Sequence, residues 1–262
     1  MEFMQHFFQV KPRPGELLTG CLGQAGFLFG NAAGTVVALD AYLGNACEKA
    51  FGFRRRIPAP VAPGALRADI VAATHAHMDH LDGDVLAALA PSAFFIGAAD
   101  CEKEVIRAGF PPERRRFLRP GESCRIRDVA FRAVYADHGE LAPEAIGLYI
   151  VSDGVRIYVT GDTSCCPDQL AASLGGAPVD IMIVPVNPAF GNPGERNAAK
   201  MGRAFHPRVL IGAHFGMFDA HGGDPELFLE CCRDELDPET EAFAAVAGRM
   251  LLFSAAQGMK EV

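Results

Sequence analysis

Short apolar runs separated by turn residues recur along the chain and predict β-strands. Residues 26–29 and 35–39 flank a turn rich in Gly and Asn, which predicts a hairpin between residues 24 and 40. Two later runs flank Ser152-Asp153-Gly154 and predict a second hairpin. The strands predicted after the first hairpin cover residues 70–74, 93–96, 124–126, 129–136, 145–151, 155–160, 180–186, 209–213 and 250–254.

Amphipathic segments between these runs predict helices. Hairpins dominate the first part of the chain, whereas strands and helices alternate in the last part. This order predicts an α/β fold in which two mixed sheets are sandwiched between helical layers. Residues 42–67 are different, because they contain Arg54-Arg55-Arg56 and three prolines, and they predict an irregular surface insertion. The predicted helices cover residues 84–90, 100–108, 167–174, 195–205 and 225–235.

Length and composition predict a single domain spanning residues 1–262, since half of the residues are hydrophobic and can fill one core. The formal charge of −8 argues against nucleic acid as a partner. Eight cysteines in no regular framework favour a reducing compartment. No secretory signal or membrane-spanning stretch is visible, so we expect a cytoplasmic protein with no membrane partner.

The run His75-Ala76-His77-Met78-Asp79-His80 places three imidazoles and a carboxylate in one loop between a predicted strand and a predicted helix. Neutral imidazole and carboxylate are ligands that suit zinc, iron and manganese. His75 and His77 can converge on one ion while Asp79 and His80 turn toward a second. A solvated, His-rich turn is the alternative, and it is disfavoured because such clusters are costly unless metal or hydrogen bonds satisfy them.

Three more candidate ligands follow later predicted strands: His138, Asp162 and His214. Sites in sheet-based folds gather at strand ends, where loops from distant sequence meet. Alone, the three have ordinary interpretations as a loop residue, a turn former and a core histidine. Their joint occurrence in this order after the histidine-rich loop favours a metal site.

With these residues the chain resembles a metallo-β-lactamase-fold hydrolase. The segments Gly52–Pro60 and His214–Pro225 further resemble the branch that contains L-ascorbate-6-phosphate lactonase. The resemblance covers nearly the whole chain and implies an αββα four-layer sandwich with one or two divalent ions, manganese or zinc. It implies one ion held by His75, His77 and His138, another held by Asp79, His80 and His214, and Asp162 between them.

Other polar residues are candidates for the surroundings of the metal. Asn187 and Asn192 could hydrogen-bond a polar substrate, although Asn in a Pro/Gly loop is often a turn residue. Asp219 and His221, just beyond His214, are candidates for substrate binding or proton transfer. Asp40 ends a predicted strand and could hold the second nitrogen of a ligand histidine, or could merely end a turn.

The residues and the resemblance together predict a metal-dependent hydrolase that opens a small polar or anionic lactone. The ions would lower the pKa of a bound water so that hydroxide attacks the acyl carbon. Asp79 would position this nucleophile and take its proton, and His221 would protonate the leaving oxygen. The alternatives are a phosphodiesterase on the same fold and a non-catalytic metal-binding protein. The expected partner is a small-molecule substrate, with homo-oligomers possible.

Overall fold

Eight strands form the first β-sheet of the computed structural model, which describes residues 2–262. These strands are β1 (Glu16–Gly23), β2 (Gly26–Gly30), β3 (Val36–Leu39), β4 (Ile70–Ala73), β5 (Phe94–Ala98), β6 (Arg115–Leu118), β14 (Met250–Ser254) and β15 (Gly258–Glu261). Their order across the sheet is β15-β14-β1-β2-β3-β4-β5-β6. Strands β3 to β6 are parallel to one another, and the other neighbours are antiparallel.

Seven strands form the second sheet, in the order β13-β12-β11-β10-β9-β8-β7. They are β7 (Ser123–Ile126), β8 (Val129–Tyr135), β9 (Ile146–Ser152), β10 (Val155–Val159), β11 (Ile181–Pro185), β12 (Val209–Ala213) and β13 (Glu241–Ala244). Strands β10 to β13 are parallel, so their carboxyl ends lie at one edge of the sheet.

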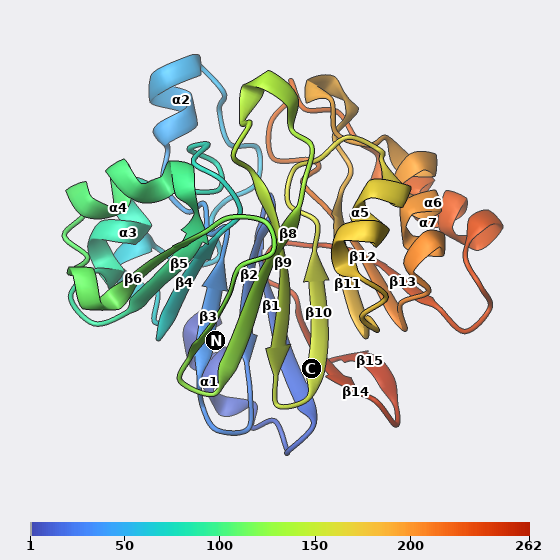
Figure 1. Ribbon diagram of the computed structural model, residues 1–262, viewed down its shortest axis with the longest axis horizontal. Helices are drawn as coiled ribbons and strands as arrows, with labels where there is room; N and C mark the ends of the chain where they lie inside the picture. The colour runs from blue at the N-terminus through green and yellow to red at the C-terminus, as the bar shows by residue number, and fades with distance from the viewer. Residues whose placement is uncertain (1) are drawn as a thin grey trace.

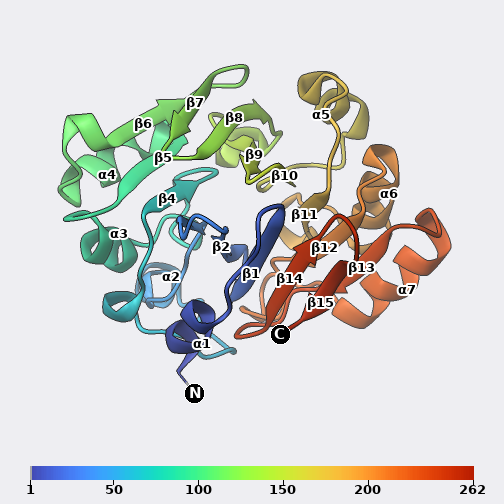
Figure 2. The ribbon, with the colours of Figure 1, turned by 90° about the horizontal axis from the view of Figure 1, so that it is seen from below.

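Helices cover the outer faces of the two sheets. Figure 1 shows α3 and α4 on one side and α5, α6 and α7 on the other, with the strands between them, and the view from below separates the same two groups (Figure 2). The order of layers is therefore αββα, as predicted. The helices are α1 (Phe3–Gln9), α2 (Ala46–Phe51), α3 (Gly83–Leu89), α4 (Glu102–Arg107), α5 (Pro167–Leu174), α6 (Glu195–Phe205) and α7 (Pro225–Glu235).

Strand β11 contributes apolar side chains to two hydrophobic clusters. All five of its residues are buried. Ile181 and Ile183 join the large apolar cluster that contains residues of both sheets, whereas Met182 and Val184 pack in a second cluster with α5 and α7. Successive side chains of a strand point to opposite faces, so a strand covered on both sides is apolar throughout.

The two sheets are joined by backbone hydrogen bonds at one end. The Ile146 N–H donates to the Thr74 carbonyl at 3.0 Å, and the His214 N–H donates to the Gln24 carbonyl at 2.9 Å. Both bonds lie beside candidate ligands, and they fix the loops of one sheet against those of the other. Helix α2 lies at one end of the molecule and α1 at the opposite end (Figure 1).

Several elements differ from the prediction. Helix α2 lies within the segment predicted to be irregular, so that prediction is wrong for Ala46–Phe51. Helix α1 and strands β1, β6, β13 and β15 were not predicted. Strand β1 includes Thr19 and Gly20, which interrupt its apolar pattern, and β6 carries Arg115 and Arg116 at the edge of the sheet, so neither has a clear strand signal. Among residues 2–262, no helix is long and apolar enough to cross a membrane.

Candidate metal centre

The loop that follows β4 is a tight turn closed by hydrogen bonds. The backbone N–H groups of His80 and Leu81 donate to the His77 carbonyl at 2.9 and 2.8 Å. The loop ends at Asp82, whose carboxylate caps α3 by accepting from the Asp84 N–H at 2.9 Å and also accepts from the Gly44 N–H at 2.6 Å. The cap fixes where α3 begins and therefore where the preceding side chains point.

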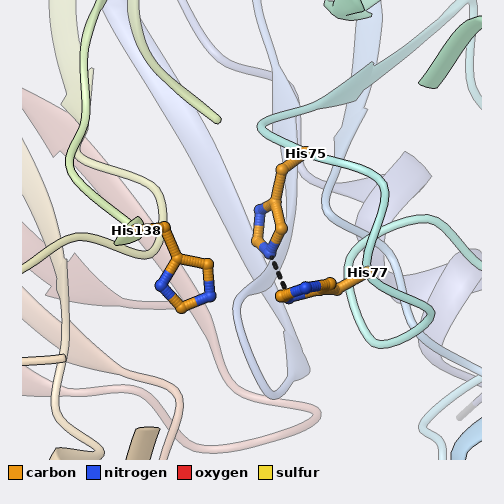
Figure 3. Close-up of side chains that lie close together, drawn as sticks. All are labelled: His75, His77 and His138. Atoms are coloured by element: carbon orange, nitrogen blue, oxygen red, sulfur yellow. Dashed lines mark hydrogen bonds between the residues drawn. The ribbon is translucent and has the colours of Figure 1, made fainter. Parts of the chain in front are cut away.

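His75, His77 and His138 form the first group of candidate ligands. One ring nitrogen of each lies within 4.8 Å of the others, and Nε2 of His75 is 2.9 Å from Nδ1 of His77. Figure 3 shows the three rings directed toward one space from two different loops. The sequence prediction grouped these same residues around one ion.

Asp162 lies between this group and the next. Its Oδ2 is 3.7 Å from Nε2 of His138 and 3.4 Å from Nε2 of His214, and its Oδ1 is 3.5 Å from Nε2 of His80. The Nε2 atoms of His80 and His214 are themselves 3.0 Å apart. Asp162 Oδ1 is buried and has no hydrogen-bond partner among the described residues. A buried carboxylate oxygen without a donor is costly for folding, and such an oxygen suits a cation.

A third group combines Asp79, His214 and His221. Gln24 Nε2 donates to Asp79 Oδ2 at 2.8 Å and lies 3.2 Å from His221 Nδ1. The sequence placed His80 in this group with Asp79 and His214. The structure also brings His221 within ligand distance of both, whereas the sequence suggested substrate binding or proton transfer for His221.

Asp40 lies on the outer side of the centre, where it contacts His80 and Thr74. Its Oδ2 lies 3.0 Å from His80 Nδ1, and its carboxylate also accepts from the Thr74 N–H and hydroxyl, each at 2.8 Å. Gln24, Asp40 and His214 have φ angles of 54°, 41° and 69°, a backbone region that residues other than Gly rarely adopt. Such strain gathers at functional sites, where the surrounding structure must enforce it.

Charge is unevenly shared within the centre. Burial lowers the pKa of His75 well below its ordinary value, helped by the neighbouring His80. Burial also disfavours the charge on His80, but Asp162, Asp40 and Asp79 outweigh it and raise the pKa of His80 well above its ordinary value. Burial likewise opposes ionisation of Asp79 and Asp162, yet nearby imidazoles such as His80 and His214 outweigh it and hold the pKa of both carboxyls low. Both carboxylates are therefore ionised at neutral pH.

The donor set fits a divalent cation. Five imidazoles and two carboxylates converge from four loops, and Asp162 Oδ1 has no hydrogen-bond donor within residues 2–262. Ligands of this kind suit zinc, iron or manganese, and the donors do not distinguish among these metals. His75, His77, His80, His138, His214, Asp79 and Asp162 could together hold one or two such ions.

A pocket of about 450 Å³ opens onto the centre. Asp79, Asp162, His138 and His221 line it, as does Asn187. Asn187 is buried, and neither its amide nitrogen nor its carbonyl oxygen has a hydrogen-bond partner among the described residues. A buried amide without a partner lowers the stability of the fold by about 1–3 kcal/mol. The Asn187 side chain can therefore hydrogen-bond a ligand in the pocket.

Two of the candidate substrate residues lie outside this pocket. Asn192 is buried, and its Oδ1 accepts from the Thr163 N–H at 2.7 Å, so it holds the loop that carries Asp162. Asp219 is exposed and pairs with Arg56 at 3.4 Å. Neither side chain lines the pocket, and a substrate role for either stays a prediction.

Sequence reasoning missed Gln24 and the apolar wall of the pocket. Gln24 lies in the tight turn between β1 and β2, and nothing in its sequence neighbourhood marks it as functional. The wall contains Phe53, Phe190 and Phe218, which come from separate loops. Only the fold brings them together.

Comparisons with known proteins agree with this geometry. The family model described as "Beta-lactamase superfamily domain" matches residues 35–215. A "UPF0173 metal-dependent hydrolase" of Anaeromyxobacter dehalogenans is 27% identical over 234 residues, covering 83% of this chain and 81% of that protein. A protein of the same description from Archaeoglobus fulgidus is 32% identical over 181 residues, covering 65% of this chain and 76% of its own length.

Solved structures share the fold at lower identity. A possible metal-dependent hydrolase from Veillonella parvula has a TM-score of 0.73 at 16% identity, covering 89% of this chain and 98% of that one. An isothiocyanate hydrolase from Delia radicum gut bacteria has a TM-score of 0.71 at 19% identity, covering 91% and 99%. These likenesses show the fold alone.

Proposed function

Since the chain belongs to the β-lactamase superfamily and matches metal-dependent hydrolases over most of its length, we propose that it is a metal-dependent hydrolase that opens a lactone or a similar small ester. One observation carries the proposal. The pocket wall combines a partly buried Asp79 and a buried Asp162, both ionised, with the amide of Asn187, which has no hydrogen-bond partner among the described residues. Acyl hydrolysis needs a place for a nucleophile beside a polar group that binds the carbonyl or the leaving oxygen.

We assign the metal ligands as the sequence did. His75, His77 and His138 would hold one divalent ion, and Asp79, His80 and His214 would hold another. Asp162 lies close to both sets and would bridge them. Bound zinc or manganese would supply Lewis acidity, which lowers the pKa of water and polarises a carbonyl.

Asp79 would accept the proton of the attacking water, and His221 would contact the leaving oxygen. Gln24 Nε2 carries two hydrogens, and its distances of 2.8 Å to Asp79 Oδ2 and 3.2 Å to His221 Nδ1 allow it to donate to both. Asp79 then stays oriented as an ionised carboxylate that can accept a proton from an attacking water. His221 accepts at Nδ1, so its neutral ring carries its hydrogen on Nε2 and can hydrogen-bond to the leaving oxygen, which takes up the proton that Asp79 accepted from the water.

The narrower assignment to the L-ascorbate-6-phosphate lactonase branch is supported by the Gly52–Pro60 and His214–Pro225 segments. We therefore propose that the bond cleaved is a lactone, as in that branch. The phosphate has less support, because the described lining of the pocket includes neither Lys nor Arg.

A panel of lactones, carboxylic esters and phosphodiesters tests the proposal on the purified protein. We expect lactone or ester cleavage that is lost to a chelator and restored by manganese or zinc. Faster cleavage of a phosphodiester than of any lactone or ester would favour the phosphodiesterase instead. Full metal occupancy without turnover of any of these compounds would favour a non-catalytic metal-binding protein.

A further inference from the structure

Four exposed apolar side chains surround the mouth of the pocket. They are Phe51 at the end of α2 (63% exposed), Met78 in the histidine-rich loop (42%), Leu141 (57%) and Phe190 (36%). Eight large apolar side chains are exposed among residues 2–262, and half of them meet at this one opening. Single exposed apolar residues are ordinary, whereas a contiguous group at a concave site marks a binding surface.

The apolar surface continues from the mouth to the catalytic groups. Phe53 lies between the rim and the interior, with ring centroids 6.0 Å from Phe51, 6.1 Å from Phe190 and 5.9 Å from Phe218. Phe53, Phe190 and Phe218 also surround His221. Their ring centroids lie 5.7, 5.0 and 4.8 Å from the centroid of the His221 ring. A ligand that enters toward Asp79 therefore passes along apolar side chains before it reaches the polar groups of the centre.

The nearby arginines are not available to recognise an anionic substrate. Arg55 donates to the Tyr42 carbonyl at 2.9 Å, and its guanidinium lies 4.9 Å from the centre of the Tyr42 ring. Arg56 pairs with Asp219. Both arginines and Arg54 line a separate depression on the surface, and none of the three lines the catalytic pocket.

We propose that this pocket selects substrates with an uncharged, apolar alkyl or arylalkyl group attached to the scissile lactone or ester. The inference rests on the proposed function and replaces a polar or anionic substrate with an apolar one. The rim side chains would cover the hydrocarbon group, while Asn187 and the metal centre would contact the polar bond that is cleaved. Each methylene buried against such a wall strengthens binding roughly three- to fourfold.

Chain-length dependence tests this inference. The protein with its metal is given γ-lactones whose alkyl side chain lengthens from methyl to hexyl, and a phosphorylated lactone for comparison. We expect kcat/KM to rise about three- to fourfold per methylene until the pocket is filled, with the phosphorylated lactone the poorest substrate. A flat series, or a preference for the phosphorylated lactone, would overturn the inference.

Substitutions at the rim test whether these side chains cause the dependence of kcat/KM on chain length. Phe190→Ala and Leu141→Ala should flatten the dependence of kcat/KM on chain length, and Phe51→Lys should improve the anionic lactone relative to the hexyl lactone. Ile106→Ala is the matched control, because Ile106 is an exposed apolar residue of α4 outside the pocket. Sedimentation of the same variants serves as a second readout. If the rim variants changed only the association state and left the chain-length slope intact, the rim would be an interface between copies and the inference would fail.

Binding measurements separate this inference from the proposed function. Tetrahydrofurans with the same alkyl groups have no bond to hydrolyse, and calorimetry reports their affinity. If no lactone or ester is cleaved but affinity still rises with chain length, the apolar selectivity stands and the hydrolase assignment fails. If lactones are cleaved but neither affinity nor rate responds to chain length, the hydrolase stands and the selectivity fails.

Discussion

Asp40 Oδ2 lies 3.0 Å from Nδ1 of His80, and both side chains are fully buried. The carboxylate accepts the Nδ1 hydrogen, which leaves Nε2 of His80 facing His214 and Asp162 as the nitrogen that would lose its proton and bind a metal. The same carboxylate accepts two hydrogen bonds from Thr74, the residue before His75. Asp40 therefore orients one candidate ligand directly and anchors the strand end that carries the others.

Replacing Asp40 with Asn should weaken metal binding by about 10- to 100-fold, the usual cost of losing a partner behind a ligand histidine. Asn keeps the size of the side chain and tolerates the positive φ of this position. Competition with a chromogenic chelator measures the affinity. Asp69→Asn is the control, since Asp69 also accepts a backbone hydrogen bond, from Val36, but lies outside the metal groups. Equal losses in the two variants would assign Asp40 a purely structural role.

His77→Ala and Asp162→Ala should each abolish hydrolysis while leaving a folded protein. Both remove a proposed ligand, and neither residue belongs to the apolar clusters that form the core. Metal analysis should show reduced occupancy, and circular dichroism should show unchanged secondary structure. A near-normal rate with full metal content in either variant would contradict the ligand assignment.

Asn187→Ala should lower kcat by about 10²- to 10³-fold at full metal content, the range measured for loss of one donor to a developing oxyanion. The amide lines the pocket, and no hydrogen-bond partner in the described part of the chain compensates for its loss. Asn192→Ala is the matched control, because Asn192 comes from the same loop but bonds to Thr163 rather than facing the pocket. If the two variants lose activity equally, Asn187 supports the loop and does not contact the substrate.

The candidate ligands could be placed from sequence because each stands at the end of a recognisable strand. Parallel pairing of β10 to β13 brings strand ends to one edge, so His214 and Asp162 meet although 52 residues separate their numbers. Asp40 also ends a predicted strand, and its contact with Nδ1 of His80 agrees with the role suggested for it from the sequence, which was to hold the second nitrogen of a ligand histidine. Gln24 could not be found this way, because it follows a strand that was not predicted and its contact with Asp79 depends on the order of β1 to β4 within the first sheet.

The substrate side of the pocket was harder to predict. Phe51 and Phe53 belong to the segment that was predicted to be irregular, and Phe190 and Phe218 are more than 130 residues further along the chain. Apolar residues in loops give no periodic signal, so sequence reasoning weighed only the polar residues nearby. The polar or anionic substrate stays a prediction from the sequence, made without knowledge of the four Phe side chains in the pocket wall.

Asp128→Asn should make stability less dependent on pH in acid. Slight desolvation raises the pKa of Asp128, but hydrogen bonds from the Thr35 hydroxyl (2.5 Å) and the Asn31 amide (2.6 Å) outweigh it and lower the pKa. A lowered folded-state pKa gives stability that is present above the unfolded value of about 3.9 and is lost as pH falls through the folded value. Urea titrations of both proteins between about pH 6 and pH 2 should show their difference shrinking toward acid. A constant difference would refute the linkage.

His221→Gln should retain the metal and lower kcat by about 10²- to 10³-fold, the range measured for loss of one donor to a developing oxyanion. Burial, with His214 nearby, lowers the pKa of His221 to about 4, so the ring is neutral near pH 7. It hydrogen-bonds to the leaving oxygen through the Nε2 hydrogen that the Gln24 contact specifies, and the proton that this oxygen takes comes from the attacking water. Gln retains a polar side chain between the aromatic rings, which limits any structural loss. Metal content and kcat are measured on the same preparation. Lost metal would instead make His221 a ligand, as its position beside Asp79 and His214 permits. Intact metal with unchanged kinetics would leave His221 with only a packing role against Phe53, Phe190 and Phe218.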